Sequence, residues 1–196
     1  SVKKIYEEVE NLLREGVRRI VLSAPGFLDY GRDLQVEPEP LTDPRSPEPN
    51  YEALENLLSG LSDLAPIAEG EASLMIENLK GDLVMEKAAK ILGKYLSGTP
   101  VNIGFETGSE IQSKIIGRSS TPSENLEAVR RLGKAGLKPY VYFIHGLPGQ
   151  NYETVKATVR AIDDSVAAGA SRIILYRFQP LPMSTYQDLP RAPPSA

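Results

Sequence analysis

The chain has 196 residues, 41% of them hydrophobic, so it can fold around one large core or two small ones without covalent cross-links. Its net charge of −4 argues mildly against a nucleic-acid-binding domain. Cysteine is absent, which excludes disulfides and cysteine-ligated metals within these residues, and His145 is the single histidine. The residues show no signal-peptide pattern and no apolar run near about 18 residues. We therefore expect a cytoplasmic location and no membrane contact.

Apolar residues recur with strand and helix spacing in alternation along the chain. The pattern predicts strands at residues 17–22, 72–76, 101–105, 137–144 and 172–178. It predicts helices at residues 2–15, 51–61, 83–96, 110–116, 122–135 and 152–168. Residues 24–50, rich in Pro, Asp and Glu, form a long loop that is either functional or a surface excursion.

Helix-start signals precede four of these helices. Thr121 and Glu124 make a capping box, with Pro122 at the first helical position. Three more residues are predicted to cap the helices that follow them: Asn50, Asp82 and Asn151. The last helix is expected to turn its larger apolar side chains inward, namely Val155, Val159, Ile162 and Val166.

Alternating strands and helices imply a parallel sheet with right-handed crossovers. An open doubly wound sheet and a partial β/α barrel both fit the pattern, and periodicity does not separate them. In either fold, ligands gather at the carboxyl ends of the strands. We expect one domain over residues 1–185, followed by a Pro-rich tail at 186–196.

The most informative stretch follows the strand at 101–105. Glu106 stands there as a carboxylate that could bind an amino group or ribose hydroxyls, or be a solvated loop residue. Thr107 and Ser109 offer hydroxyls and backbone N–H groups at a helix start, for a ligand or for ordinary capping. Arg118 could pair with a ligand carboxylate, or act as a partner of the helix dipole.

A second turn follows the strand at 137–144. Gly146 and Gly149, with Leu147 and Pro148 between them, force a tight turn that lets backbone approach a flat ring. His145 is better explained as a packed or hydrogen-bonded histidine than as a general base, since no partner motif stands nearby. The segment Glu77–Asn78 closes another strand at the same edge, as a ligand contact or as part of a helix entry.

These turns resemble the radical S-adenosylmethionine (SAM) superfamily, in its methylthiotransferase-like and cobalamin-associated branches. The resemblance spans about residues 1–185. Four segments carry it: GFETGSEIQSKIIGR at 104–118, FIHGLPGQN at 143–151, EGVRRIVLSAPGFLDYG at 15–31 and YRFQPLPMS at 176–184. The first two, in this order and spacing, are the specific part.

The resemblance implies a partial β/α barrel with outer helices and reductive cleavage of SAM by a [4Fe–4S] cluster, which yields a 5′-deoxyadenosyl radical for hydrogen abstraction. Glu106 and Ser109 would contact the ribose or methionine part of SAM, with Thr107 in the same turn and Arg118 nearby. Residues 144–149 would pack on the adenine: Ile144, Gly146, Leu147, Pro148 and Gly149. The methionine amino group would lie near Ser23, Ala24 and Pro25.

The chain departs from the family pattern in three respects. It has no CxxxCxxC motif, no strand before the first helix, and Gln150 in place of the family's usual Glu. We therefore expect about five parallel strands and a fragment of an enzyme that begins after the cluster loop. This fragment would have no metal ligand of its own and would not generate the radical alone.

A missing first strand would leave residues 17–22 as an unpaired apolar edge, so we expect self-association through it. Two rival functions stay open. One is a non-catalytic β/α module that binds a nucleotide or a partner. The other is an ordinary barrel lyase or aldolase, for which Lys80 is the available lysine.

Overall fold

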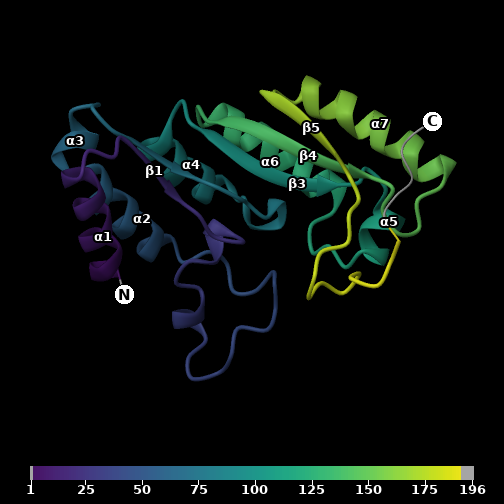
Figure 1. Cartoon of the computed structure of the whole chain (residues 1–196), viewed down its shortest axis with the longest axis horizontal. Coiled ribbons are helices and arrows are strands. Elements are labelled where there is room, and N and C mark those ends of the chain that lie inside the picture. Colours follow the sequence, from purple (N-terminus) through teal and green to yellow (C-terminus); the bar gives the residue numbers. More distant parts are fainter. Residues whose placement is uncertain (1, 191–196) are drawn as a thin grey trace.

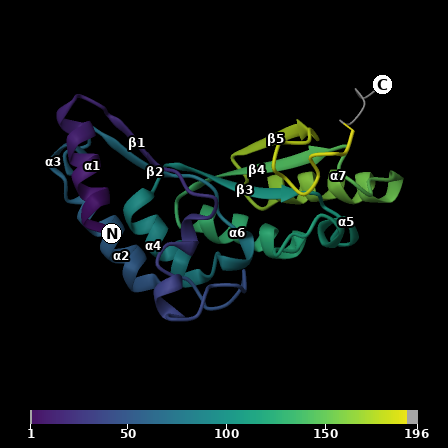
Figure 2. The same ribbon diagram turned by 60° about the horizontal axis from the view of Figure 1, so that its bottom comes forward.

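The computed structural model describes residues 2–190, so residues 191–196 of the predicted tail lie outside the described residues (Figures 1 and 2). Its strands are β1 (Arg19–Leu22), β2 (Ser73–Ile76), β3 (Pro100–Glu106), β4 (Lys138–His145) and β5 (Arg172–Arg177). Its α-helices are α1 (Val2–Arg14), α2 (Tyr51–Ser62), α3 (Ala65–Ala68), α4 (Glu86–Leu96), α5 (Glu110–Ile115), α6 (Pro122–Lys134) and α7 (Tyr152–Ala167). The alternation read from the sequence is confirmed.

All strand pairs are parallel. β1 pairs with β2, and β4 lies between β3 and β5. Leu79 joins the two groups, because its N–H donates to the carbonyl of Asn102 at 2.8 Å and it bridges to Ile103. The five strands thus follow one another in chain order as a single arc (Figure 1). That order, without a reversal, is the order of a partial β/α barrel rather than of a doubly wound sheet.

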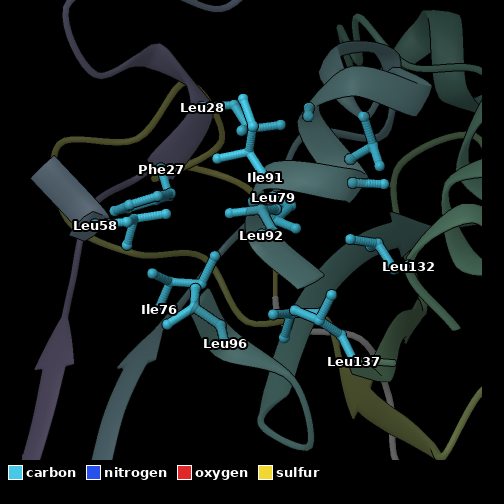
Figure 3. Close-up of a cluster of buried hydrophobic side chains, with 14 of the residues drawn as sticks. Phe27, Leu28, Leu58, Ile76, Leu79, Ile91, Leu92, Leu96, Leu132 and Leu137 are labelled. Atoms are coloured by element: carbon cyan, nitrogen blue, oxygen red, sulfur yellow. The ribbon is translucent and has the colours of Figure 1, made fainter. Parts of the chain in front are cut away.

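The helices cover the outer face of the arc, and each contacts the next in the order α1, α2, α4, α6 and α7. The core fills the space between them and the sheet, and one cluster includes Leu58, Leu92 and Leu132 from three helices and Ile76 from β2 (Figure 3). No helix within residues 2–190 is both long enough and apolar enough to cross a lipid bilayer.

The segment at 24–50 is an anchored loop with two 3₁₀ turns, at Phe27–Asp29 and Asp33–Gln35. Its anchor is Arg32, which is only 1% exposed. The guanidinium of Arg32 donates to the carbonyl of Pro47 at 2.6 and 2.9 Å and pairs with the carboxylate of Asp29 at 2.6 Å. The loop therefore closes around a buried cation that its own carbonyls satisfy.

One predicted cap is wrong. Asp82 does not begin α4, which starts at Glu86 with Met85 at the N-cap position. Instead Asp82 lies in a 3₁₀ turn, and its buried carboxylate accepts a hydrogen bond from the hydroxyl of Ser120 at 2.8 Å. Arg45 of the loop reaches the same carboxylate at 3.6 Å. A tertiary contact has replaced the local one. The caps at Asn50, Thr121 and Asn151 are confirmed.

The inward face predicted for α7 is also wrong in large part. Val155, Val159 and Val166 are 40%, 53% and 57% exposed, and only Ile162 packs against the core. The helix faces the sheet with small side chains instead: Thr154, Ala157, Thr158, Ala161 and Ser165. The turn after β3 approaches α7 so closely that a Cβ on Gly108 would lie 2.4 Å from the carbonyl of Ala157.

We expect Arg32→Met to lower the free energy of unfolding by about 2–4 kcal/mol, because the part-buried carbonyl of Pro47 and the carboxylate of Asp29 lose their buried cationic donor. The change should also open the loop, so a protease should cut within residues 29–50 faster than in the parent chain. Urea unfolding and limited proteolysis measure the two effects. Arg14→Met is the matched control, since the side chain of Arg14 is 71% exposed. Equal midpoints for both variants would contradict the anchoring role.

Candidate functional site

The candidate site lies at the carboxyl end of β3. Glu106 is its central residue and has φ of +63°, a left-handed conformation that is costly for a residue with a side chain. The register with β4 shifts between Gly104 and Glu106, so a bulge re-aims this residue. A Cβ on Gly104 would lie 2.4 Å from the carboxylate oxygen Oε1 of Glu106, so a side chain there would displace this carboxylate from its present position.

Arg118 holds the Glu106 carboxylate from the other side. Its Nη1 lies 3.6 Å from Oε1 of Glu106, and its Nη2 donates to the carbonyl of Gly104 at 2.8 Å. Burial raises the pKa of Glu106, and the positive charge of Arg118 only partly offsets the rise. The Nε of Arg118 is buried and has no hydrogen-bond partner among the described residues. The pair thus keeps unused hydrogen-bonding capacity at the strand end.

The rest of this turn, residues 107–109, is engaged in local structure. The hydroxyl of Thr107 bonds to Oε1 of Gln112 at 2.7 Å and lies 3.2 Å from that of Thr158. The hydroxyl of Ser109 accepts from the N–H of Gln112 at 3.3 Å and so caps α5. Both residues are buried, which makes them supports of the Glu106 backbone in this structure. Their contact with a ligand stays a prediction.

The second turn, at residues 145–150, lies beside the first. Gly146 and Gly149 have φ of +78° and +77°, and the N–H of Gly146 donates to the side chain of Gln150. Gln112 connects the two turns: its Nε2 donates to the carbonyls of Leu147 and Pro148 at 3.4 and 3.3 Å. The structure therefore brings the Glu106 turn and the Gly146 turn together through one buried amide.

Gln112 is the residue that sequence reasoning missed. Ser109 and Gln112 have the spacing of a capping box, which is the only local signal at this position. In the structure the Gln112 side chain does not complete a capping box. It connects the turns that follow β3 and β4 instead. Thr158 was missed as well, since its hydroxyl accepts from the N–H of Gly108 at 3.0 Å across 50 residues of sequence.

The Ser23–Pro25 segment lies at the end of β1, at the same edge but away from Glu106. The hydroxyl of Ser23 donates to the carboxylate of Glu77 at 2.5 Å, and Asn78 donates to the carbonyl of Ala24 at 3.3 Å. The three residues also line a hollow of about 720 Å³ that runs between α1 and β1. Lys80 pairs with Asp29 at 2.6 Å, which uses its amino group for the loop.

The inner face of the arc carries aromatic and polar side chains. Tyr142 stacks on Tyr176 with ring centroids 5.9 Å apart, and its hydroxyl donates to Asn102 Oδ1 at 3.3 Å. The guanidinium of Arg172 lies 5.5 Å from the ring centroid of Tyr140. Burial raises the pKa of the Tyr142 hydroxyl, and its neighbour Tyr176 adds to the rise. These side chains alternate with residues that face the helices, so they belong to the concave side.

We expect the carboxyl of Glu106 to titrate above its ordinary value of 4.5, and Arg118→Gln to raise that pKa further. A ¹³C-carboxyl NMR titration measures both. Because the pKa is raised on folding, the contribution of Glu106 to stability falls as pH rises from 4.5 through the folded-state pKa. Glu106→Gln should remove this slope from urea unfolding at different pH values.

Glu124 is the internal control for this titration. Burial pushes its pKa up, but hydrogen bonds from Thr121 and the charge of Arg45 outweigh burial and lower it. Its carboxyl should therefore titrate below 4.5 in the same spectra, and Arg118→Gln should not move it. A Glu106 resonance that titrates with Glu124 would refute the burial of the Glu106 carboxylate.

Comparisons with known proteins identify the family of this chain. The Radical SAM superfamily model matches residues 1–162. An uncharacterized protein of Methanocaldococcus jannaschii is 50% identical over 94% of this chain, and one of Methanopyrus kandleri is 44% identical over 98% of it. The chain spans 35% of the length of each of these curated relatives.

A solved structure shares the fold. The radical S-adenosylmethionine methyltransferase TsrM from Kitasatospora setae, solved with tryptophan substrate and a SAM analog, superposes with a TM-score of 0.68 at 16% identity. The match covers 95% of this chain and 32% of TsrM. The same enzyme has been solved with cobalamin and a [4Fe–4S] cluster bound. With a family model that covers most of its length, this chain belongs to the radical SAM superfamily.

Proposed function

We propose that this chain is the SAM-binding portion of a radical SAM enzyme that abstracts hydrogen from a substrate not yet identified. The observation that carries the proposal is Glu106, a partly buried carboxylate in a strained backbone conformation at the end of a barrel strand. Strain of this kind persists where the surrounding structure enforces it, and it gathers at functional sites. The neighbouring Gly146 turn supplies a backbone surface for a flat ring.

SAM suits the groups present at this edge. Its ribose hydroxyls or amino group can donate to the Glu106 carboxylate, which accepts no hydrogen bond from a described side chain. Its methionine carboxylate can accept from the Nη groups of Arg118, whose side chain is 32% exposed. Its adenine can rest on Ile144 and the Gly146 turn, where the glycines keep side chains out of the way.

The iron–sulfur cluster does not fit this chain. The chain has no cysteine, and residues 2–190 hold no group of three His, Asp or Glu side chains arranged for a metal. Because the chain spans about a third of its curated relatives, we propose that the thiolate ligands come from another part of the natural polypeptide.

The residues of this chain then bind, orient and shield. Glu106 and Arg118 fix the two ends of the polar part of SAM, and the buried side chain of Leu147 excludes water beneath the adenine. The substrate would lie over the concave face, where the ring of Tyr176 is 57% exposed. We propose the anchored loop at 24–50 as one wall of the substrate side. A cytoplasmic location stays a prediction.

We expect the chain to bind SAM and Glu106→Ala to weaken binding at least about tenfold, since a carboxylate that accepts charge-assisted hydrogen bonds is lost. Isothermal titration calorimetry measures the affinity. Glu10→Ala on α1 is the matched control, because the side chain of Glu10 is 50% exposed and lies on the far helix. Equal loss in both variants, or none in Glu106→Ala, would place SAM elsewhere.

Radical chemistry itself is tested on the full-length M. jannaschii relative, reconstituted anaerobically with iron and sulfide. Formation of 5′-deoxyadenosine from SAM under reducing conditions would support the proposal. A relative that binds SAM with an intact cluster but yields no 5′-deoxyadenosine would favour the rival function, a non-catalytic module. Failure to take up iron and sulfide would favour the same rival.

A further inference from the structure

One side of α7 carries a row of apolar side chains that the described elements leave mostly uncovered. We call it the α7 stripe: Tyr152, Val155, Val159, Ile162 and Val166. Tyr152 is 77% exposed, and the three valines are 40–57% exposed. α7 lies on the outer face of the sheet against β4 and β5, at one end of the row of helices (Figures 1 and 2). Isolated exposed apolar residues are common, but four in one row are not. Ile162 is the half-buried member of the row, because it also packs against the core.

The spacing of the α7 stripe is that of a coiled-coil seam. Its members follow one another at steps of three, four, three and four residues, which are the a and d positions of two heptads. An apolar face that packs on a sheet would be wider and would include the small residues of the buried side. Here the seam and the sheet-facing side are neighbouring sides of one helix and share Ile162 at their border, so the four exposed members of the seam are available for a second helix.

The two flanks of the seam differ. The g positions, Thr158 and Ser165, are turned into the protein, where Thr158 bonds to Gly108 and Ser165 bonds to the carbonyl of Ala161. The e positions, Lys156 and Asp163, are exposed and carry opposite charges. Because the g positions are turned into the protein, a partner helix can form ion pairs only with the charged e positions.

We propose that the α7 stripe is a dimer interface, with α7 of a second copy of this chain packed antiparallel against it. In an antiparallel pair, e positions face e positions of the other helix. With Val159 opposite Ile162 of the second copy, Val155 lies opposite its Val166. Lys156 of one copy then lies beside Asp163 of the second copy. The two-fold axis repeats this pair of opposite charges. A parallel pair would instead set these charges against buried g positions.

The neighbouring edge strand enlarges this surface. Ile173 of β5 packs against the core beside α7, and Leu175 points to the same side because side chains alternate along a strand. Leu175 is 57% exposed, so it can contact a helix that lies against the α7 stripe. The interface is small for a permanent dimer, which predicts an association that depends on concentration.

Sedimentation velocity of this chain over a range of concentrations tests the proposal. We expect a reversible dimer, and Val159→Lys should raise its dissociation constant by roughly 100-fold or more, because the seam loses two apolar contacts and gains two charges. The variant should stay folded, since Val159 is half exposed. Leu34→Lys is the matched control, with an aliphatic side chain 60% exposed in the loop. A monomeric parent chain, or a dimer that survives Val159→Lys, would overturn the proposal.

Charge reversal tests the antiparallel register. At low salt, Lys156→Asp should weaken the dimer roughly tenfold, because both cross-helix pairs become repulsive. Adding Asp163→Lys in the same chain should restore the affinity. A double variant as weak as Lys156→Asp alone would exclude this register.

The edge strand β1 is the competing surface for self-association. Val21 on β1 is 37% exposed and borders the hollow against α1. Val21→Lys should leave the dimer intact if the α7 stripe is the interface. A dimer lost in Val21→Lys and kept in Val159→Lys would assign the association to β1 and refute the α7 pairing.

Discussion

One backbone contact decides the shape of this molecule. The N–H of Leu79 donates to the carbonyl of Asn102 at 2.8 Å and joins a two-stranded and a three-stranded group into one arc. Because the strands are parallel and follow in chain order, every crossover helix falls on the same outer face. The carboxyl ends of all five strands then meet at one edge, and the inner face is left without helices. Both parts of the candidate site follow from this constraint.

At that edge, the strained backbone of Glu106 is surrounded by contacts that hold it in place. Glu106 keeps a left-handed backbone because Gly104 makes room for its carboxylate and Arg118 pairs with it. The turn beneath it is held by buried hydrogen bonds, with Gln112 at the centre. A strained residue that several neighbours restrain is pre-organised, so ordering it on ligand binding costs little conformational entropy.

In α7, small residues face the sheet and the larger apolar residues lie on a neighbouring, exposed side. Gly108 brings the first turn so close to α7 that a large side chain would collide there. Small residues therefore face the sheet, and the larger apolar residues are displaced to the neighbouring side. The same residues that a hydrophobic pattern assigns to the core thus become surface. Whether a side chain of a helix is buried depends on how closely that helix approaches the sheet. The hydrophobic pattern along the helix does not show this distance.

Much of the fold could be predicted from the sequence because its signals are local. Strand and helix positions came from periodicity, with boundaries within two residues except at the start of α4, and the short α3 was missed. The caps at Asn50, Thr121 and Asn151 depend only on residues three positions apart. Asp82 failed as a cap because Ser120, which is remote in sequence, binds its carboxylate.

The sequence by itself thus determined the order of strands and helices, the two glycine-containing turns and the family. Only the tertiary structure decided between a barrel arc and a doubly wound sheet, since that choice depends on which strands become neighbours. It also decided that Gln112 links the two turns, that Arg32 is buried within its loop and that α7 faces outward with its valines. Each of these is a contact between residues distant in sequence, and local patterns carry no information about such contacts.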